Sequence, residues 1–138
     1  MKKYISQNEL DHFSFHDCVI DTINIMNNEI IMVLESIDVL AEHSLNPYDV
    51  AKNTDACTIR FINVEQHRAK IYKDNYESVL PLVEMNDSEI LKFDYKKVNR
   101  TNEYIIFGSA SSKYNNNFSE IIIIAENVEL GWNKYEDD

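Results

Sequence analysis

Glycine is almost absent from this 138-residue sequence, which contains only Gly108 and Gly131. Phosphate-binding loops (G-x-G-x-x-G and G-x-x-x-x-G-K-[ST]) and the nucleophile elbow G-x-S-x-G need at least two glycines at fixed spacing, and none of these motifs occurs. The zinc-protease motif H-E-x-x-H is also missing. These absences argue against dinucleotide-binding enzymes, P-loop enzymes and α/β-hydrolases.

Cysteines and long apolar runs are scarce as well. Cys18 and Cys57 lie in apolar, strand-like contexts, where a free cysteine behaves as a small buried hydrophobe, so we expect no disulfide framework. No apolar run is longer than that from Ile121 to Ala125, far below the ~20 residues that a membrane span needs. The start, MKKYISQNEL, has no apolar run after its two lysines and predicts neither a secretory signal nor an anchor. We therefore expect a cytoplasmic protein.

Basic residues are few, because 13 Lys and Arg stand against 24 Asp and Glu and give a formal net charge of −11. Such a charge repels phosphate backbones and anionic lipid headgroups, so we expect neither nucleic acid nor a membrane as a partner. It favours another protein with a basic surface, since complementary charge speeds encounter. The alternative is that the acidity serves solubility alone.

What the sequence does contain is enough apolar material for one core. Hydrophobic residues make up 44% of the chain, and 15 residues are aromatic (8 Tyr, 6 Phe and 1 Trp). At this length one domain over residues 1–138 is the expectation, folded without a cofactor.

Local patterns near the N-terminus predict a β-hairpin. Apolar residues spaced by two run from Phe15 to Met26, with a slip at Asp21-Thr22 that indicates a bulge. Asn27-Asn28 follows as a two-residue hairpin loop, since asparagine tolerates the positive φ that such loops require. The next segment, Glu29 to Leu34, is apolar at consecutive positions, which predicts a strand covered on both faces.

Helix signals are weak. The spacing Ser6-Gln-Asn-Glu9 fits a capping box and predicts a short helical turn over Gln7 to Phe13. Asp74 to Met85 predicts a helix that is short or absent, because Pro81 would break it. Between Ser36 and Asp55 the turn residues predict a long irregular excursion.

The remaining pattern is typical of strands. In Cys57 to Ile62, alternate residues (Cys57, Ile59 and Phe61) face inward, and Glu65 to Ile71 is either a further strand or a polar connection. Four later strands are predicted at Ile90 to Lys96 (with Leu91, Phe93 and Tyr95 in phase), Glu103 to Ala110, Phe118 to Glu126 and Val128 to Trp132, with Asn115-Asn116-Asn117 as a hairpin tip.

These elements predict a mainly β fold, either all-β or α+β with one or two short helices. The strands are expected to form an antiparallel sheet, arranged as a sandwich, a partly open barrel or a single curved sheet. The sequence does not distinguish between these arrangements.

Candidate metal ligands gather only at Asp11, His12, His16, Asp17 and Cys18. Zinc and iron sites need three or four converging ligands, usually from more than one element, so we expect no metal here. Hydrogen bonding by His16 and a turn at Asp17 explain the cluster as well. His43 and His67 stand alone in polar segments. Acidic or apolar neighbours surround both thiols, which argues against a reactive cysteine.

Aromatic residues concentrate in the C-terminal half, where most are expected in the core. An exposed patch among them would form a protein-binding face, and Trp132, beside the acidic tail, is the expected anchor. The binding residues that we expect are Trp132, Tyr114, Glu129, Asp17 and His16.

The stretch Phe15-His16-Asp17, leading into the apolar positions Ile20 and Ile23, resembles the start of small bacterial immunity proteins from polymorphic toxin systems. Several of those families begin with Phe-His-Asp before their first strand. The resemblance implies a cytoplasmic protein that binds and neutralises a specific toxin, and it carries over no catalytic residue.

The leading hypothesis is therefore a non-catalytic protein-binding domain whose partner is a protein with a basic surface, such as a toxin. One alternative is a small-molecule-binding β-barrel, favoured by strands with apolar residues on both faces. Another is a metal-dependent enzyme built on His12, His16 and Asp17. The protein is expected to be a monomer or a homodimer, because strand edges can pair two copies.

Overall fold

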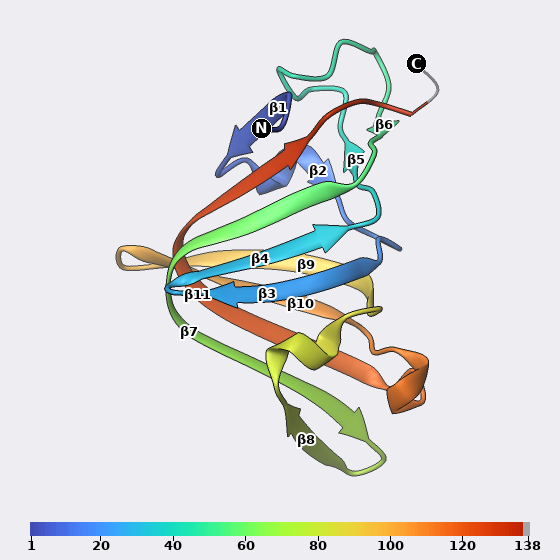
Figure 1. Ribbon diagram of the computed structural model, residues 1–138, viewed down its shortest axis with the longest axis vertical. Coiled ribbons are helices and arrows are strands. Elements are labelled where there is room, and N and C mark those ends of the chain that lie inside the picture. Colours follow the sequence, from blue (N-terminus) through green and yellow to red (C-terminus); the bar gives the residue numbers. More distant parts are fainter. Residues whose placement is uncertain (137–138) are drawn as a thin grey trace.

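The computed structural model describes residues 1–136 and shows a mainly β protein (Figure 1). Its strands are β1 (Tyr4–Gln7), β2 (Phe13–Ser14), β3 (Ile20–Met26), β4 (Glu29–Leu34), β5 (Asp38–Val39), β6 (Lys52–Asn53), β7 (Cys57–Lys73), β8 (Tyr76–Leu80), β9 (Glu89–Val98), β10 (Thr101–Ser109) and β11 (Phe118–Trp132). Three single 3₁₀ turns, η1 (Leu10–His12), η2 (Leu82–Met85) and η3 (Ser112–Tyr114), are the helical elements of the described residues. None of them has the length or apolar character to cross a membrane.

One curved antiparallel sheet dominates the structure, with the strand order β3-β4-β7-β11-β10-β9. β1 adds to one end of β11, and β8 adds to one end of β7. The short strands β2, β5 and β6 form a second, small sheet near the N-terminus (Figure 1). The prediction of a mainly β antiparallel fold is confirmed, and the arrangement is a curved sheet that does not close into a barrel.

The two ends of the sheet approach each other at one place. Just before β3, Val19 forms an isolated antiparallel bridge with Glu89 at the start of β9. The Ile20 N–H donates to the Ser88 carbonyl at 2.8 Å, and the Asp87 N–H donates to the Ile20 carbonyl at 2.6 Å. This short junction links segments that are about 70 residues apart in the sequence.

The curvature of the sheet has a visible origin in β7, where Asn63 adopts a left-handed φ of 57°. Next to it the register with β11 shifts between Ile124 and Ala125, so one extra residue of β7 forms a bulge. The Asn63 side chain accepts a hydrogen bond from Asn28 Nδ2 at 3.0 Å and donates one to the Glu126 carboxylate at 2.9 Å. Figure 1 shows that β7 and β11 bend together.

Asparagine and aspartate take the role that glycine has in most turns. Nine non-glycine residues among residues 1–136 have positive φ, and every one is Asn or Asp, whereas neither glycine has positive φ. Their short polar side chains tolerate the left-handed region better than other L-residues do. The many Asn and Asp residues therefore mark the turns and bulges of this fold.

The predicted N-terminal hairpin is confirmed. β3 pairs with β4 through the turn at Asn27-Asn28, and the register shifts between Ile20 and Thr22, where the bulge was predicted. The prediction that β4 is covered on both faces is wrong. Its burial alternates, with Ile30, Met32 and Leu34 in the core, because the other face of the sheet is left uncovered.

Three predictions of element boundaries are corrected. The segment Gln7 to Phe13 is not one helical turn, because Ser6 and Gln7 belong to β1 and only Leu10–His12 is helical. Ser6 Oγ donates to the Glu9 carboxylate, so there is no capping box.

The other two corrections concern β7 and β11. Residues 57–73 and 118–132 are each one continuous strand, whereas the sequence pattern divides each of them into two segments. β8 was not predicted, and of the expected helix at Asp74 to Met85 only η2 exists, beginning after Pro81.

Gly108 is required by a close approach between β10 and β9. A Cβ atom at Gly108 would lie 2.1 Å from the Glu89 carbonyl oxygen, closer than any real contact. Here Phe107 pairs with Lys92 and Gly108 with Ile90, so Leu91 is the extra residue of a bulge. The predicted phase of Leu91 is therefore wrong, and Ile90 takes the buried position instead.

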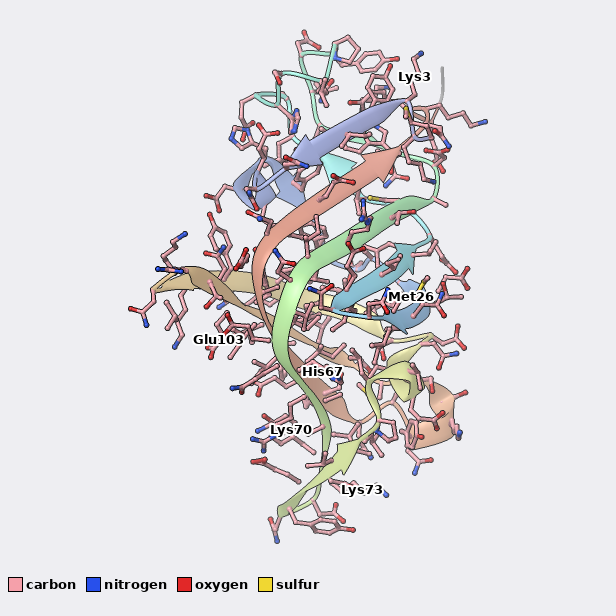
Figure 2. All side chains as sticks on the ribbon, turned by 60° about the vertical axis from the view of Figure 1, so that its left-hand side comes forward. Lys3, Met26, His67, Lys70, Lys73 and Glu103 are labelled. Carbon is pink, nitrogen blue, oxygen red and sulfur yellow. The ribbon has the colours of Figure 1, made fainter. Side chains whose placement is uncertain are left out.

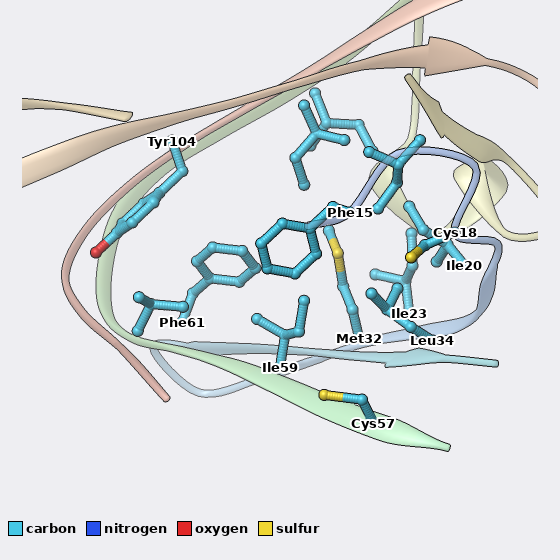
Figure 3. Close-up of a cluster of buried hydrophobic side chains, with 14 of the residues drawn as sticks. Phe15, Cys18, Ile20, Ile23, Met32, Leu34, Cys57, Ile59, Phe61 and Tyr104 are labelled. Atoms are coloured by element: carbon cyan, nitrogen blue, oxygen red, sulfur yellow. The ribbon is translucent and has the colours of Figure 1, made fainter. Parts of the chain in front are cut away.

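The core fills the concave side of the sheet. Figure 3 shows Phe15, Met32, Ile59, Phe61 and Tyr104 packed together between the curved strands. Phe61 and Tyr104 meet with their ring centroids 5.2 Å apart, and burial of each such side chain contributes roughly 1.5–3 kcal/mol. Within residues 1–136, side chains fill this side of the sheet, which does not close into a barrel.

The irregular excursion between Ser36 and Asp55 is present, interrupted only by β5 and β6. Buried Asn46 holds its outer loop, because Asn46 Nδ2 donates to the carbonyls of Val39, Leu40 and Val50 at 3.0–3.2 Å. Asn46 Oδ1 accepts from the Tyr48 N–H at 2.7 Å. The loop is thus pinned over the aromatic residues of the core.

We expect Asn63→Ala to lower the free energy of unfolding, because alanine in the left-handed conformation costs roughly 1–2 kcal/mol and the two side-chain hydrogen bonds are lost. Asn63→Gly loses the same hydrogen bonds but not the conformational preference, so it should be the more stable of the two variants. Urea denaturation of both measures the difference. A glycine variant no more stable than the alanine variant would contradict the role given to Asn63.

Candidate functional site

The Phe15-His16-Asp17 stretch fastens the chain to the start of β9. The Phe15 ring packs on Phe93 with centroids 4.7 Å apart. His16 Nδ1 donates to the carbonyl of the bulge residue Leu91 at 3.1 Å, and the Asp17 N–H donates to the Ile90 carbonyl at 2.8 Å. All three residues therefore have a structural role, while the His16 and Asp17 side chains remain 65% and 64% exposed.

Carboxylates gather around this junction of the two sheet ends. Besides Asp17, they come from Asp21 in β3, Glu35 after β4, Asp87 before β9 and Glu89 in β9. Backbone contacts place them side by side: the Glu35 N–H donates to the Val19 carbonyl at 3.0 Å, Asp87 bonds Ile20, and Glu89 pairs with Val19. We call these five residues the acidic edge.

No lysine or arginine within residues 1–136 forms an ion pair with a member of the acidic edge, and His16 beside Asp17, at 3.4 Å, is the one salt-bridge partner. Four of the five residues are exposed and Glu89 is half-buried. Their charges are therefore available to an external partner.

The acidic edge belongs to a larger asymmetry of charge along the chain. Residues 4–51 contain no Lys or Arg, whereas they contain nine carboxylates: Glu9, Asp11, Asp17, Asp21, Glu29, Glu35, Asp38, Glu42 and Asp49. The rest of the chain holds all 13 basic residues against the other 15 acidic ones. Nearly all of the net charge thus comes from one segment, and a potential concentrated in this way attracts cationic surfaces.

Exposed apolar side chains lie at the end of β3 away from the junction and in η2. β3 ends in Ile25 and Met26, which are 43% and 57% exposed, and Val83 in η2, which packs beside β3, is 46% exposed. Protein interfaces combine apolar contacts with a polar rim. β3 and η2 supply exposed apolar residues along the same side of the sheet edge that carries Asp21.

The prediction that Trp132 is an exposed anchor is wrong, because the residue is completely buried. Its ring lies between Tyr4, stacked at a centroid distance of 5.6 Å, and Phe13, at 5.7 Å edge to face. Tyr135 and His43 complete the surroundings. Since β1, β2 and the loop 40–51 cover it, the tryptophan stabilises the N-terminal end of the core.

Tyr114 and Glu129 lie on other parts of the surface and are engaged there. The Tyr114 hydroxyl in η3 donates to the Glu84 carboxylate, which also binds Lys113 Nζ at 2.7 Å. Glu129 in β11 pairs with Arg60 at 3.2 Å. Of the five predicted binding residues, only His16 and Asp17 are brought together, and they lie at the acidic edge.

The residues proposed for a metal site do not converge. The His12 ring turns inward and meets the His43 ring edge to face at 5.5 Å, whereas His16 lies exposed against β9. Within residues 1–136, no three His, Cys, Asp or Glu side chains are grouped as a metal ion would require. The alternative of a metal enzyme built on His12, His16 and Asp17 has no geometric support.

His43, which the sequence placed in a polar segment, is buried and uses both ring nitrogens. Nδ1 accepts from the Leu45 N–H at 2.9 Å, and Nε2 lies 3.0 Å from Ser6 Oγ, which in turn donates to Glu9. Because Nδ1 is an acceptor, the neutral ring carries its proton on Nε2 and donates it to Ser6. This histidine therefore cannot act as a base toward Ser6, and burial lowers its pKa below the ordinary 6.5.

Three depressions in the described surface are large enough to note. The most polar is about 230 Å³ in volume and lies where β1 and β10 separate along β11, lined by Tyr95, Lys97, Asn102, Tyr104 and Glu126 among others. Asn8 and Asn102 side chains bond the β11 backbone there, at Val128 N–H and the Glu126 carbonyl. The polar lining is thus largely used in closing the gap between strands.

Comparison with known proteins finds no match to a family model, to a curated protein or to a solved structure. Function is therefore inferred from the residues of the chain itself.

We expect the free energy of unfolding to fall as the pH drops below about 6.5, in part because His43 must stay neutral in the folded state. A pKa lowered by burial means that the unfolded chain binds the proton first, so this stability is complete above 6.5 and is lost as the pH falls. Urea denaturation of the wild type and of His43→Gln between about pH 7.5 and pH 5 tests it. The variant should show a smaller loss, and equal losses would contradict the account.

Both thiols should be unreactive in the folded protein. Burial raises the pKa of Cys18 and of Cys57 to about 12, from an ordinary value of 9.0. Thiolate is the reactive form, so alkylation at pH 8 should be about a thousandfold slower than for free cysteine. Iodoacetamide labelling followed by mass spectrometry measures it, with guanidinium-unfolded protein as the control. Rapid labelling of folded protein would disprove the burial of these residues.

Proposed function

We propose that this protein is a non-catalytic binding domain that neutralises a basic protein, of the kind found among toxins, through the acidic edge. One observation carries the proposal: the sheet ends meet at a junction surrounded by five carboxylates that have no lysine or arginine partner within residues 1–136. Three of the five, Asp17, Asp21 and Glu35, come from a segment with nine acidic and no basic residues. Asp17 and His16, the residues that resemble the start of immunity proteins, lie at the same place.

The physical basis is electrostatic complementarity. Charged surfaces of opposite sign steer two proteins into encounter and suppress wrong partners, and rim charges act mainly on the association rate. Enzymes that cleave nucleic acids bind phosphate with basic surfaces, so an acidic edge can occupy such a surface in place of the substrate. The exposed Ile25, Met26 and Val83 would supply the apolar contacts.

The contacts of the reactive side chains support a role without catalysis. His43 is held between a backbone amide and Ser6, and both thiols are buried with a raised pKa. A cytoplasmic location is part of the proposal, since free thiols persist in a reducing compartment.

The direct test is co-expression with the product of the adjacent gene, followed by affinity measurement. We expect binding that weakens steeply with salt, because the contributing charges are exposed. In Asp21→Lys/Glu35→Lys the affinity should fall by more than about tenfold, since two attractive charges become repulsive.

The matched control is Glu42→Lys/Asp49→Lys, which changes the net charge equally at exposed residues of the loop 40–51. This variant should keep its affinity within about threefold. Equal losses in the two variants would show that only overall charge matters. An adjacent gene product that does not bind the wild type at near-physiological salt would remove the proposal itself.

A further inference from the structure

β8 is an edge strand, and one of its sides is unpaired among the described residues. It pairs only with residues Ala69 to Lys73 of β7, and its other side has no strand partner among the described residues. Tyr76 and Val79 are 62% and 66% exposed. Lysine, proline and bulges often block such edges, and residues 76–80 contain none of these; the one charged residue of β8 is Glu77, and Pro81 follows the strand.

The other long edges are protected. β9 carries Lys92, Lys96 and Lys97 along its exposed part, and lysine is the residue that most often blunts an edge. β3 is hydrogen-bonded at Ile20 to residues 87–88, packs beside η2, and lies in the acidic segment, where two copies would repel each other. β8 is thus the edge most open to a second copy.

The hairpin geometry identifies which backbone groups are free. Lys73 pairs with Tyr76 across the two-residue turn Asp74-Asn75, so this closing pair is hydrogen-bonded. Hydrogen-bonded and non-bonded pairs alternate along an antiparallel ladder. Ser78 and Leu80 therefore bond to β7, while the N–H and C=O groups of Glu77 and Val79 point to the free edge.

We propose that two copies of this chain associate through β8, antiparallel, around a two-fold axis at Ser78. Glu77 of each copy then pairs with Val79 of the other, and each of these two pairs exchanges two backbone hydrogen bonds. Tyr76 of each copy comes to lie opposite Leu80 of the other, which adds apolar cross-strand contacts. This interface uses none of the acidic edge and does not depend on the proposed function.

Glu77 in β8 and Pro81, which follows the strand, favour this register over the two registers with the axis one residue earlier or later. An axis at Glu77 would set two carboxylates directly opposite each other, which is destabilising. An axis at Val79 would pair Glu77 with Pro81, which has no N–H to donate. The Ser78 register avoids both faults.

The local charge around β8 does not oppose the approach of a second copy, although the net charge of the chain is −11. Residues 66–81 contain Arg68, Lys70 and Lys73 against Asp74 and Glu77, and Lys70 binds Glu77 at 2.9 Å. Figure 1 places β8 at one end of the long axis, opposite β1, β2 and β5 of the acidic segment. In Figure 2, Lys70 and Lys73 mark β7 as it runs towards this end.

Sedimentation equilibrium of the whole chain tests the proposal. Because the shared edge is short and the buried area small, we expect weak association, with the average mass rising from 16.2 kDa towards twice that value between about 10 µM and about 1 mM. A mass that stays at 16.2 kDa over this range would overturn the proposal.

Three substitutions at Val79 test the register. Val79→Pro removes an N–H that points to the free edge, not one that bonds β7, and should abolish dimer formation. Val79→Glu places a carboxylate opposite Glu77 of the other copy and should weaken association at least about tenfold, whereas Val79→Lys places a cation there and should preserve or strengthen it.

The same substitutions have opposite effects within one copy, which separates association from folding. Lys70 lies directly opposite Val79 on β7, so Val79→Glu is favourable and Val79→Lys unfavourable for the isolated hairpin. Val83→Glu, an equal charge change on η2, is the control and should dimerise like the wild type. Equal dimer formation by the glutamate and lysine variants of Val79 would reject the Ser78 register.

Discussion

Asn63 allows the 17-residue strand β7 to bend and to pair with strands in both halves of the sheet. Before Asn63 the strand pairs with β4 and with residues 127–131 of β11, and after it with residues 119–125 of β11 and with β8. The left-handed residue and the adjacent bulge turn both halves around one core, so that Phe61 and Ile71 face the same interior. Other L-residues resist this conformation, and glycine is scarce in the sequence.

The bend has a consequence at the opposite side of the molecule. A flat sheet would keep β3 and β9 apart at its two ends, whereas the curved one brings residues 17–20 against residues 87–90. At this junction, backbone N–H and C=O groups of the two segments are hydrogen-bonded to each other. The side chains of Asp17, Asp21 and Asp87 face solvent. The acidic edge thus results from this contact between the two ends of the sheet, and three of its five residues come from the segment 4–51, which has no basic residue.

Local features of the fold were predictable from the sequence, and features that depend on distant contacts were not. The hairpin at Asn27-Asn28 and the bulge at Asp21-Thr22 follow from short patterns of side-chain alternation and turn residues. In the sequence, Asn63 is indistinguishable from a turn residue, so the pattern leaves open whether residues 65–71 form a strand or a polar connection. Trp132 was expected on the surface because its burial depends on β1, β2 and the loop 40–51. The acidic edge is not predictable from local patterns because Val19 and Glu89 are 70 positions apart, although the nine carboxylates of residues 4–51, a segment without lysine or arginine, are a visible signal.

Hydrogen–deuterium exchange tests the central claim most directly, by comparing this protein alone and in complex with the product of the adjacent gene. Exchange reports which backbone segments a partner shields. We predict that the complex slows exchange in residues 17–26, around Glu35 and in residues 83–90, which carry the acidic edge and the exposed apolar residues of β3 and η2. Protection confined to the outer face of β10 and β11, with no change at the acidic edge, would contradict it.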